Sequence, residues 1–327
     1  MFLRAKSVLF PVLALAGLLL IPSWLGAQTA TARVSFRFDN EAYGAPALQA
    51  EPAAPKDISK LSVRLYGAYS TIGAADMNKG ARGLYDLIAL YDSLGTGSAV
   101  GEYEPTHGGA NYGADVIYQI TPRIGVGLGA GYMKSSNEPL MAFAVDGEGA
   151  VAGIITGGPT LSAVPVRLGV FASFPVSGKL DLTANAGGAW YAGLKLRVKR
   201  RFDLSSSDWT EMNLTGSRSD LSNLGFQGGL GLEYKLSRTM GFFVEAEGRY
   251  ASFKNFDSVT SMTTSSAGAS ETETGKLYVV TSTFPEGSYS TFFISETPPV
   301  SSPSTIYEDP KIDLSGFALR AGIHIRF

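Results

Sequence analysis

The sequence predicts an all-β fold, an antiparallel barrel of eight strands that crosses a membrane. Three observations predict it: eight runs of alternating apolar and polar residues, connections that alternate between short and long, and aromatic residues near both ends of the apolar faces. Successive side chains of a strand point to opposite faces of its sheet, so each run gives a strand with one apolar and one polar face.

The N-terminal end is expected to direct the chain out of the cytoplasm. Arg4 and Lys6 precede an apolar run, Val8–Ile21, in the pattern of a secretory signal peptide. The run is shorter than the ~20 apolar residues that a membrane-spanning helix needs. Cleavage is expected after Ala27, with Ala32 as the alternative. We therefore expect a signal peptide at 1–27, a periplasmic arm and linker at 28–59, and the barrel at 60–327.

Each of the first four expected strands shows the alternation in its own way. Leu61–Tyr69 has mainly aliphatic residues on one face and includes serine and arginine on the other. Asn111–Ile120 has aliphatic residues and tyrosine on one face and polar residues on the other. In Ile124–Tyr132 every second residue is glycine, which suits a crowded barrel wall better than a phosphate-binding loop. Val164–Phe174 carries valine, leucine and phenylalanine on one face and an arginine on the other.

The last four expected strands repeat the pattern. Leu180–Arg197 places leucine, alanine and tryptophan against polar residues, so Lys195 is expected to point inward. Asn223–Lys235 and Phe242–Tyr250 each carry glutamates on the polar face. Phe317–Phe327 alternates strictly up to its last residue.

The connections between these strands alternate in length. Short joins fall near 121–123, 175–179 and 237–240, and long ones near 73–110, 134–162, 199–222 and 254–311. Short periplasmic turns and long extracellular loops are typical of outer-membrane barrels. The first long loop is expected to hold a short amphipathic helix with the stripe Leu84, Leu87, Ile88 and Tyr91. The fourth is expected to hold a hairpin that pairs Leu277–Phe284 with Ser288–Ser295.

The apolar face is expected to meet lipid. Aromatic residues near both ends of the runs predict the two girdles of a membrane barrel. The opposite face combines glycine with charges of both signs, as a narrow lumen filled by side chains requires. A soluble, lipocalin-like barrel, whose apolar face points inward, is the alternative.

The inward charges predict a plugged lumen. An unpaired buried charge costs several kcal/mol, so charges inside a narrow barrel must pair with one another. We expect one network of seven side chains: Arg64, Asp115, Arg167, Glu245, Glu247, Arg249 and Arg320. We expect four others to face inward as well: Asp181, Glu233, His324 and Arg326. A pore or gate built from the same charges is the alternative.

The C-terminal strand indicates how the chain reaches its membrane. Ile323, Ile325 and Phe327 share its apolar face, and the last residue is aromatic. This ending resembles the signal that bacterial outer-membrane barrels present to their assembly machinery. With its strand pattern and girdles, 60–327 resembles small eight-stranded barrels of the OmpA-transmembrane, OmpX and OmpW type. The resemblance implies the bacterial outer membrane, with its lipid and lipopolysaccharide and the barrel assembly machinery as partners.

The composition narrows the function. The chain has no cysteine, and its net charge of -2 gives no basic surface for nucleic acid. No motif places a nucleophile beside His107, so we expect no catalytic residue, cofactor or metal site. The leading expectation is a non-enzymatic barrel with a structural or surface-interaction role through its long extracellular loops. The alternatives are a small-solute or apolar-ligand channel and, third, a lipid-modifying enzyme.

Deleting Phe327 is expected to block membrane insertion, because the last strand then loses its terminal aromatic. The variant should remain in the periplasm, where added protease degrades it. Phe327→Tyr keeps an aromatic end and should insert normally. Cell fractionation followed by immunoblotting measures both variants, and wild-type amounts of the deletion variant in the membrane fraction contradict the assignment.

Overall fold

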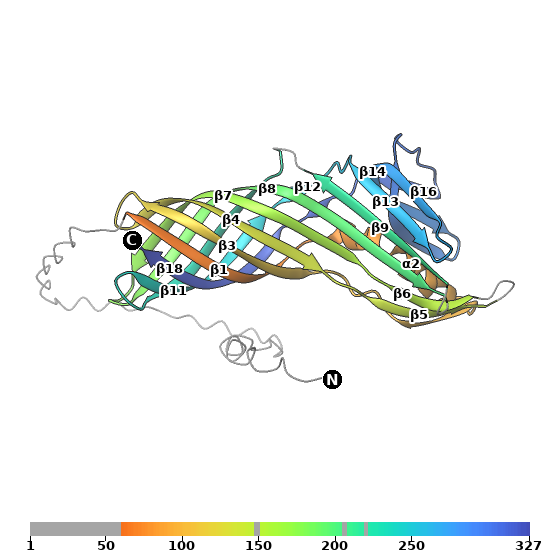
Figure 1. Ribbon diagram of the computed structural model, residues 1–327, viewed down its shortest axis with the longest axis horizontal. Helices are drawn as coiled ribbons and strands as arrows, with labels where there is room; N and C mark the ends of the chain where they lie inside the picture. The colour runs from red at the N-terminus through yellow and green to blue at the C-terminus, as the bar shows by residue number, and fades with distance from the viewer. Residues whose placement is uncertain (1–59, 147–150, 205–207, 219–221) are drawn as a thin grey trace, which may run out of the picture. The chain divides into compact units, whose positions relative to one another are not determined.

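The computed structural model describes residues 60–146, 151–204, 208–218 and 222–327 (Figure 1). Eight antiparallel strands close into a barrel, which confirms the predicted fold. In order around the wall they are β1 (Leu61–Thr71), β3 (Gly108–Gln119), β4 (Ile124–Ser136), β7 (Pro159–Pro175), β8 (Leu180–Asp203), β10 (Leu224–Lys235), β11 (Met240–Tyr250) and β18 (Gly316–Arg326). The expected signal peptide and periplasmic arm, 1–59, lie outside the described residues.

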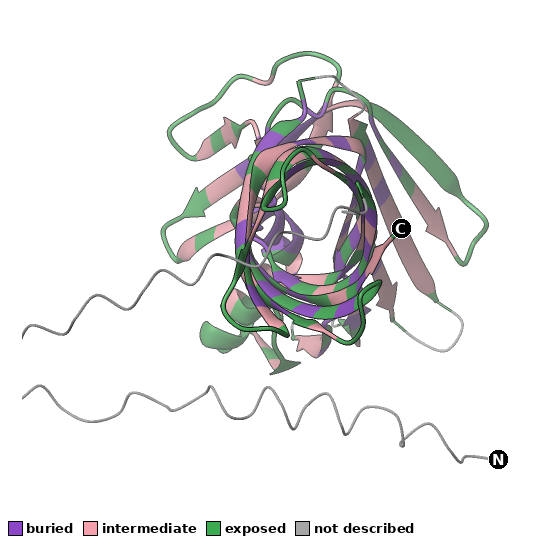
Figure 2. Ribbon diagram, turned by 90° about the vertical axis from the view of Figure 1, so that its left-hand side faces the viewer, coloured by how far each residue is buried: buried purple, intermediate pink, exposed green. Residues whose placement is uncertain are grey.

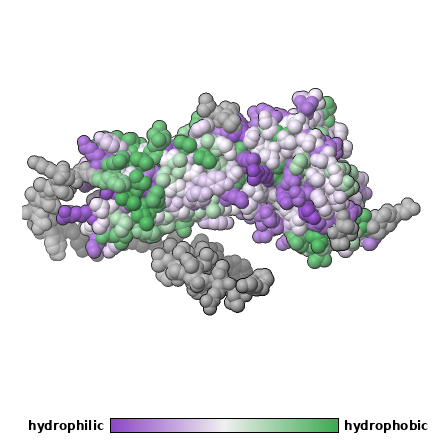
Figure 3. Space-filling model, in the orientation of Figure 1, coloured by the Kyte–Doolittle hydropathy of each residue, from purple (hydrophilic) through white to green (hydrophobic). Residues whose placement is uncertain are grey.

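The barrel wall is apolar outside and polar inside, as predicted. Leu128 and Leu168 are 58% and 67% exposed, whereas Arg64 and Arg167 are buried in the lumen. Figure 3 shows hydrophobic atoms gathered over the left-hand part of the surface, which the barrel strands cover in the same view of Figure 1. The exposed aromatic residues near the strand ends form the two expected girdles: Tyr69, Tyr112, Phe226, Tyr250 and Phe317 at one rim, and Tyr118, Phe174, Tyr234, Phe242 and Phe327 at the other.

The glycines of β4 make room for large side chains inside the barrel. A Cβ at Gly129 would lie against the Asp115 carboxylate, and one at Gly127 would lie 2.6 Å from the Phe171 ring. A Cβ at Gly131 would lie 2.7 Å from the Tyr66 hydroxyl oxygen. The glycines of β4 therefore leave the space that the large side chains of the lumen occupy.

The four long connections contain more regular structure than the helix and the hairpin that were expected in them. Several strands continue the sheet beyond the barrel in the order β8-β9-β13-β14-β15 (Figure 1). The additional elements are α2 (Ala75–Ser93), β2 (Gly97–Gly101), β5 (Leu140–Val145), β6 (Val151–Thr156), β9 (Trp209–Arg218), β12 (Ser252–Phe253), β13 (Val259–Ser265), β14 (Ser270–Phe284), β15 (Gly287–Ser295), β16 (Thr305–Glu308) and β17 (Ile312–Asp313). The expected hairpin is present as β14 and β15, with Leu277 opposite Ile294.

The helix of the first connection is longer than predicted and presents another face. Its buried side chains include Met77, Ala81, Tyr85 and Ile88, whereas Tyr91 of the expected stripe is 39% exposed. The expected stripe was therefore right at Ile88 and wrong at Tyr91. The helix begins well before the stripe, and its buried glycines pack closely against β15. Within the described residues, no helix has both the length and the apolarity to cross a membrane.

A β-bulge at Gly193 inserts one extra residue into β8. Val164 of β7 pairs with Ala192, but Ser162, two residues away, pairs with Lys195. Gly193 has a φ of 55°, in the left-handed region that glycine adopts without steric cost. One extra residue exchanges the two faces of a strand.

The bulge reverses the pattern of β8. Before it, Leu182 is 42% exposed on the outer wall. After it, Leu194 and Leu196 are fully buried, and the opposite face carries Lys195 and Arg197. The prediction that Lys195 points into the lumen was therefore wrong. The alternation in the sequence is uninterrupted, so it does not reveal the bulge.

Gly193→Ala should destabilise the protein by about 1–2 kcal/mol, because an L-residue in the left-handed region clashes with its own backbone. No atom lies within 4 Å of a Cβ built at this position, so crowding does not contribute. Gly178→Ala is the matched control, since its Cβ also meets open space and its φ is not positive. Urea unfolding in lipid vesicles measures both, and equal stabilities for the two variants would contradict a bulge that requires glycine.

Candidate functional site

Arg320 lies at the centre of an ion-pair cluster in the lumen. Its Nη1 donates to Glu245 Oε1 at 3.0 Å and to Glu247 Oε2, and its Nη2 donates to Asp115 Oδ2 at 3.0 Å. The side chain is 1% exposed, and its Cζ lies 3.9 Å from the centroid of the Tyr66 ring. One guanidinium therefore joins three carboxylates that come from β3 and β11.

Two further arginines balance the cluster. Arg167 Nη2 donates to Asp115 Oδ1 at 2.7 Å, and Arg64 Nη1 donates to Glu245 Oε2 at 3.2 Å. All the charged side chains of the cluster are buried. Three arginines thus face three carboxylates, so the cluster carries no net formal charge. Because each partner is held by fixed strands, this arrangement neutralises its own charges without a bound ion.

Arg249, the seventh residue of the expected network, lies outside the cluster. Its Nε donates to the Leu314 carbonyl at 2.8 Å and its Nη2 to the Thr71 carbonyl at 3.3 Å. On β11, Arg249 lies opposite Gly316, two residues nearer the outer rim than Glu247 of the cluster. From there it binds carbonyl groups at the ends of strands rather than the carboxylates below.

A second group of charges lies nearer the periplasmic end. Glu233 Oε2 lies 2.8 Å from His324 Nδ1, and Arg326 Nη2 donates to Glu233 Oε1. Lys235 Nζ donates to Asp181 Oδ1 at 2.6 Å. The alternation predicted that Glu233, His324, Arg326 and Asp181 point into the barrel, but it did not predict how they pair.

Beyond the Arg320 cluster, toward the long connections, an apolar core fills the interior. Tyr191, Leu194 and Leu196 of β8 are fully buried in it with Met77 of α2 and Phe256. Figure 2, which looks along the barrel, shows buried residues recurring along the strands that form the ring. The core forms because the strands that leave the barrel turn apolar side chains toward α2. The lumen is thus filled by charges at one level and by apolar side chains at the next.

Arg200 fastens α2 to this core. Its Nη2 donates to the carbonyl oxygens of Gly80 and Ala81, both at 2.7 Å. Burial lowers the pKa of the Arg200 guanidinium, and nearby Tyr85 opposes that shift. Tyr85 donates its hydroxyl to the Gly157 carbonyl at 2.8 Å, and burial raises its pKa to about 12. The helix therefore accepts hydrogen bonds from Arg200 and donates one through Tyr85.

Sequence reasoning missed Arg200 and the core it supports. The fifth strand was expected to end at Arg197, but β8 continues to Asp203. The signal was present, because Leu194, Leu196 and Val198 continue the alternation that ends in Arg200. The alternation predicts that these residues form a strand, but they face inward only because of the bulge at Gly193.

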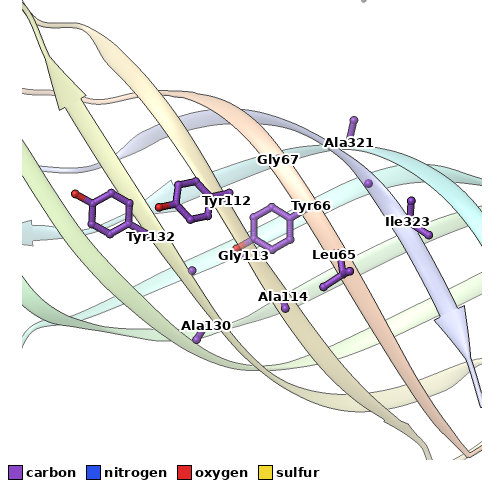
Figure 4. Close-up of a pocket in the computed structure, with 12 residues that line it drawn as sticks. Leu65, Tyr66, Gly67, Tyr112, Gly113, Ala114, Ala130, Tyr132, Ala321 and Ile323 are labelled. Atoms are coloured by element: carbon purple, nitrogen blue, oxygen red, sulfur yellow. The ribbon is translucent and has the colours of Figure 1, made fainter.

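The outer wall carries a shallow depression of about 670 Å³ (Figure 4). Small residues such as Gly67, Ala114 and Ala321 leave this hollow between larger ones such as Tyr112 and Tyr132. It offers almost only apolar groups, so it belongs to the lipid-facing surface and supplies no chemistry.

The remaining predicted site residues lie as follows. Ile323 and Phe327 are 44% and 67% exposed on the outer wall, and Ile325 pairs with Val63 on the same face. His107 is exposed, and its carbonyl accepts from the Ile72 amide at 2.9 Å. No group of histidine, aspartate or glutamate side chains suited to a metal ion occurs among the described residues.

Comparisons with known proteins give one family match and several weak structural overlays. Three crystal structures overlay weakly: OprG from Pseudomonas aeruginosa (12% identity, 83% of this chain and 99% of that chain, TM-score 0.32), a major outer membrane protein from Thermus thermophilus (12%, 82% and 99%, 0.34) and the outer membrane protease OmpT from Escherichia coli (7%, 84% and 99%, 0.28). No curated protein sequence matches the chain. The model of the outer membrane protein beta-barrel domain matches residues 42–272. The chain therefore belongs to this family and is a β-barrel of the bacterial outer membrane.

Proposed function

We propose that the protein is a non-conducting barrel that holds a folded extracellular structure at the cell surface for contact with an external ligand or partner. One observation carries the proposal: the interior is filled at two successive levels, by the Arg320 cluster and by the apolar core. An ion would have to pass both. The first would require charge pairs to separate. The second is made mainly of apolar side chains, which cannot replace the water around the ion.

One small cavity of the described lumen supports closure. The pocket at its periplasmic end has a volume of about 30 Å³, close to that of a single water molecule. Arg64, Glu233 and His324 are among the residues that line it. A passage for solutes requires a far wider continuous space, as in barrels with more strands.

The extracellular structure supports a role in contact rather than catalysis. Its strands continue the barrel sheet, and α2 is held to them by Arg200 and Tyr85. Such a structure keeps its surface in a fixed shape, so a partner does not have to order loops on binding. The only histidine on this side, His107, has no nucleophilic partner among the described residues, so an acyl-transfer or proteolytic function has no support here.

Wild-type protein reconstituted in planar lipid bilayers should give no steady ionic current. Insertion is verified separately by protease protection of vesicles prepared in the same way. A reproducible, ion-selective current from correctly inserted protein contradicts the proposal and favours the channel alternative.

Arg320→Met should lower the free energy of unfolding by about 3–5 kcal/mol, because it leaves buried carboxylates without their shared cation. Removing one carboxylate as well, in Glu247→Gln/Arg320→Met, restores equal numbers of arginines and carboxylates in the cluster. The double variant should regain part of the lost stability. Urea unfolding of the wild type, both single variants and the double variant gives the coupling energy, and strictly additive effects contradict a coupled cluster.

A further inference from the structure

The outward face of β4 and β8 becomes strongly basic where it leaves the apolar wall. Five cations lie there, and we name them the basic face: Lys134 on β4, and Lys195, Arg197, Lys199 and Arg201 on β8. The four cations of β8 occupy alternate positions, so they share one side of the strand. The bulge at Gly193 brings them outward by exchanging the faces of β8.

Carboxylates neutralise only the far end of the basic face. Lys199 Nζ lies 3.1 Å from Glu211 Oε2, and Arg201 Nη2 lies 2.8 Å from Asp203 Oδ1. Three cations form no ion pair with any described residue: Lys134, Lys195 and Arg197. These three are the ones nearest the apolar wall, so an excess of positive charge borders the membrane.

Two of the unpaired cations, Lys134 and Lys195, lie directly beyond the lipid-facing residues. Ser162 of β7 pairs with Lys134 on one side and with Lys195 on the other, so the three form a row across the sheet. Along the same faces, Tyr132 precedes Lys134 and Val164 follows Ser162, each by two residues. Two residues of a strand span about 6.6 Å. A lipid whose acyl chains cover Val164 therefore has its headgroup beside these lysines.

A groove of about 450 Å³ continues from this row along β8. Its lining residues include the cations Arg197 and Lys199, the polar residues Thr160, Thr215 and Asn213, and one carboxylate, Glu138. Cations bind phosphate, and hydroxyl and amide groups bind the hydroxyls of a sugar. The groove thus offers groups that can bind a phosphorylated sugar, and it opens directly beside the lipid-facing wall.

We propose that the basic face binds the phosphorylated headgroup of the outer-leaflet glycolipid, lipopolysaccharide. Its acyl chains lie against the apolar wall of β4 and β7. Its phosphates contact Lys134, Lys195 and Arg197, and its sugar enters the groove along β8. This contact adds a specific lipid to the proposed surface role and does not depend on whether the lumen conducts.

The test compares wild-type protein with two variants that each lose three positive charges. The first is Lys134→Gln/Lys195→Gln/Arg197→Gln. The control removes exposed cations elsewhere, as Lys179→Gln/Arg238→Gln/Lys254→Gln. Binding of bisphosphorylated lipid A to the purified full chain is measured by native mass spectrometry and titration, with dephosphorylated lipid A and free glucosamine 1-phosphate as further probes. Heat-modifiable migration in gels confirms that each variant is folded.

We expect the first variant to bind lipid A at least ~10-fold more weakly than the wild type, and the control to bind as the wild type does. The wild type should bind dephosphorylated lipid A weakly, with an affinity no higher than that of the first variant for intact lipid A. Equal affinities of the two variants overturn the proposal. Displacement of lipid A by glucosamine 1-phosphate at similar concentrations also overturns it, because the ligand is then soluble. If the first variant does not fold, Lys134→Gln and Arg197→Gln are measured singly, and unchanged affinity in both overturns the proposal.

Discussion

Charge neutrality inside a narrow barrel is the constraint on which the rest of this structure depends. The wall has only eight strands, so its lumen holds side chains instead of water, and every buried charge must find its opposite there. Arg320 satisfies three carboxylates at once, and its position is fixed by the closed register of β11, β18 and β1. The glycines of β4 follow from the same constraint, because the cluster and Tyr66 need the space that Cβ atoms would occupy.

The closed barrel was predictable from sequence because its register leaves little freedom. Once alternation assigns faces to eight strands, Arg64, Asp115 and Arg320 must point inward, and the structure brings them together. Arg249 shows the limit of that reasoning. Arg249 shares the inward face, but it lies nearer the outer rim, beside backbone carbonyl groups that accept its hydrogen bonds. Alternation predicts which face a side chain occupies, but not how far along the barrel axis it lies.

The extracellular half was not predictable in the same way. Polar connections between membrane strands resemble loops in composition, yet here they pair with one another into a continuing sheet and enclose a core. The pairing of β9 with β13 joins segments far apart in the chain, which periodicity cannot reveal. The fourth-connection hairpin was predictable because its two strands are adjacent and a short turn joins them.

One residue connects the two halves. Without the extra residue at Gly193, Leu194 and Leu196 would face outward beyond the membrane, and Lys195 and Arg197 would face the interior without carboxylates to receive them. With it, the same alternating sequence serves two environments: apolar side chains meet lipid below the bulge and fill the closing core above it. The cations displaced outward by that exchange are the ones that border the lipid-facing wall. Closure of the interior and the basic face outside are therefore two results of a single change of register.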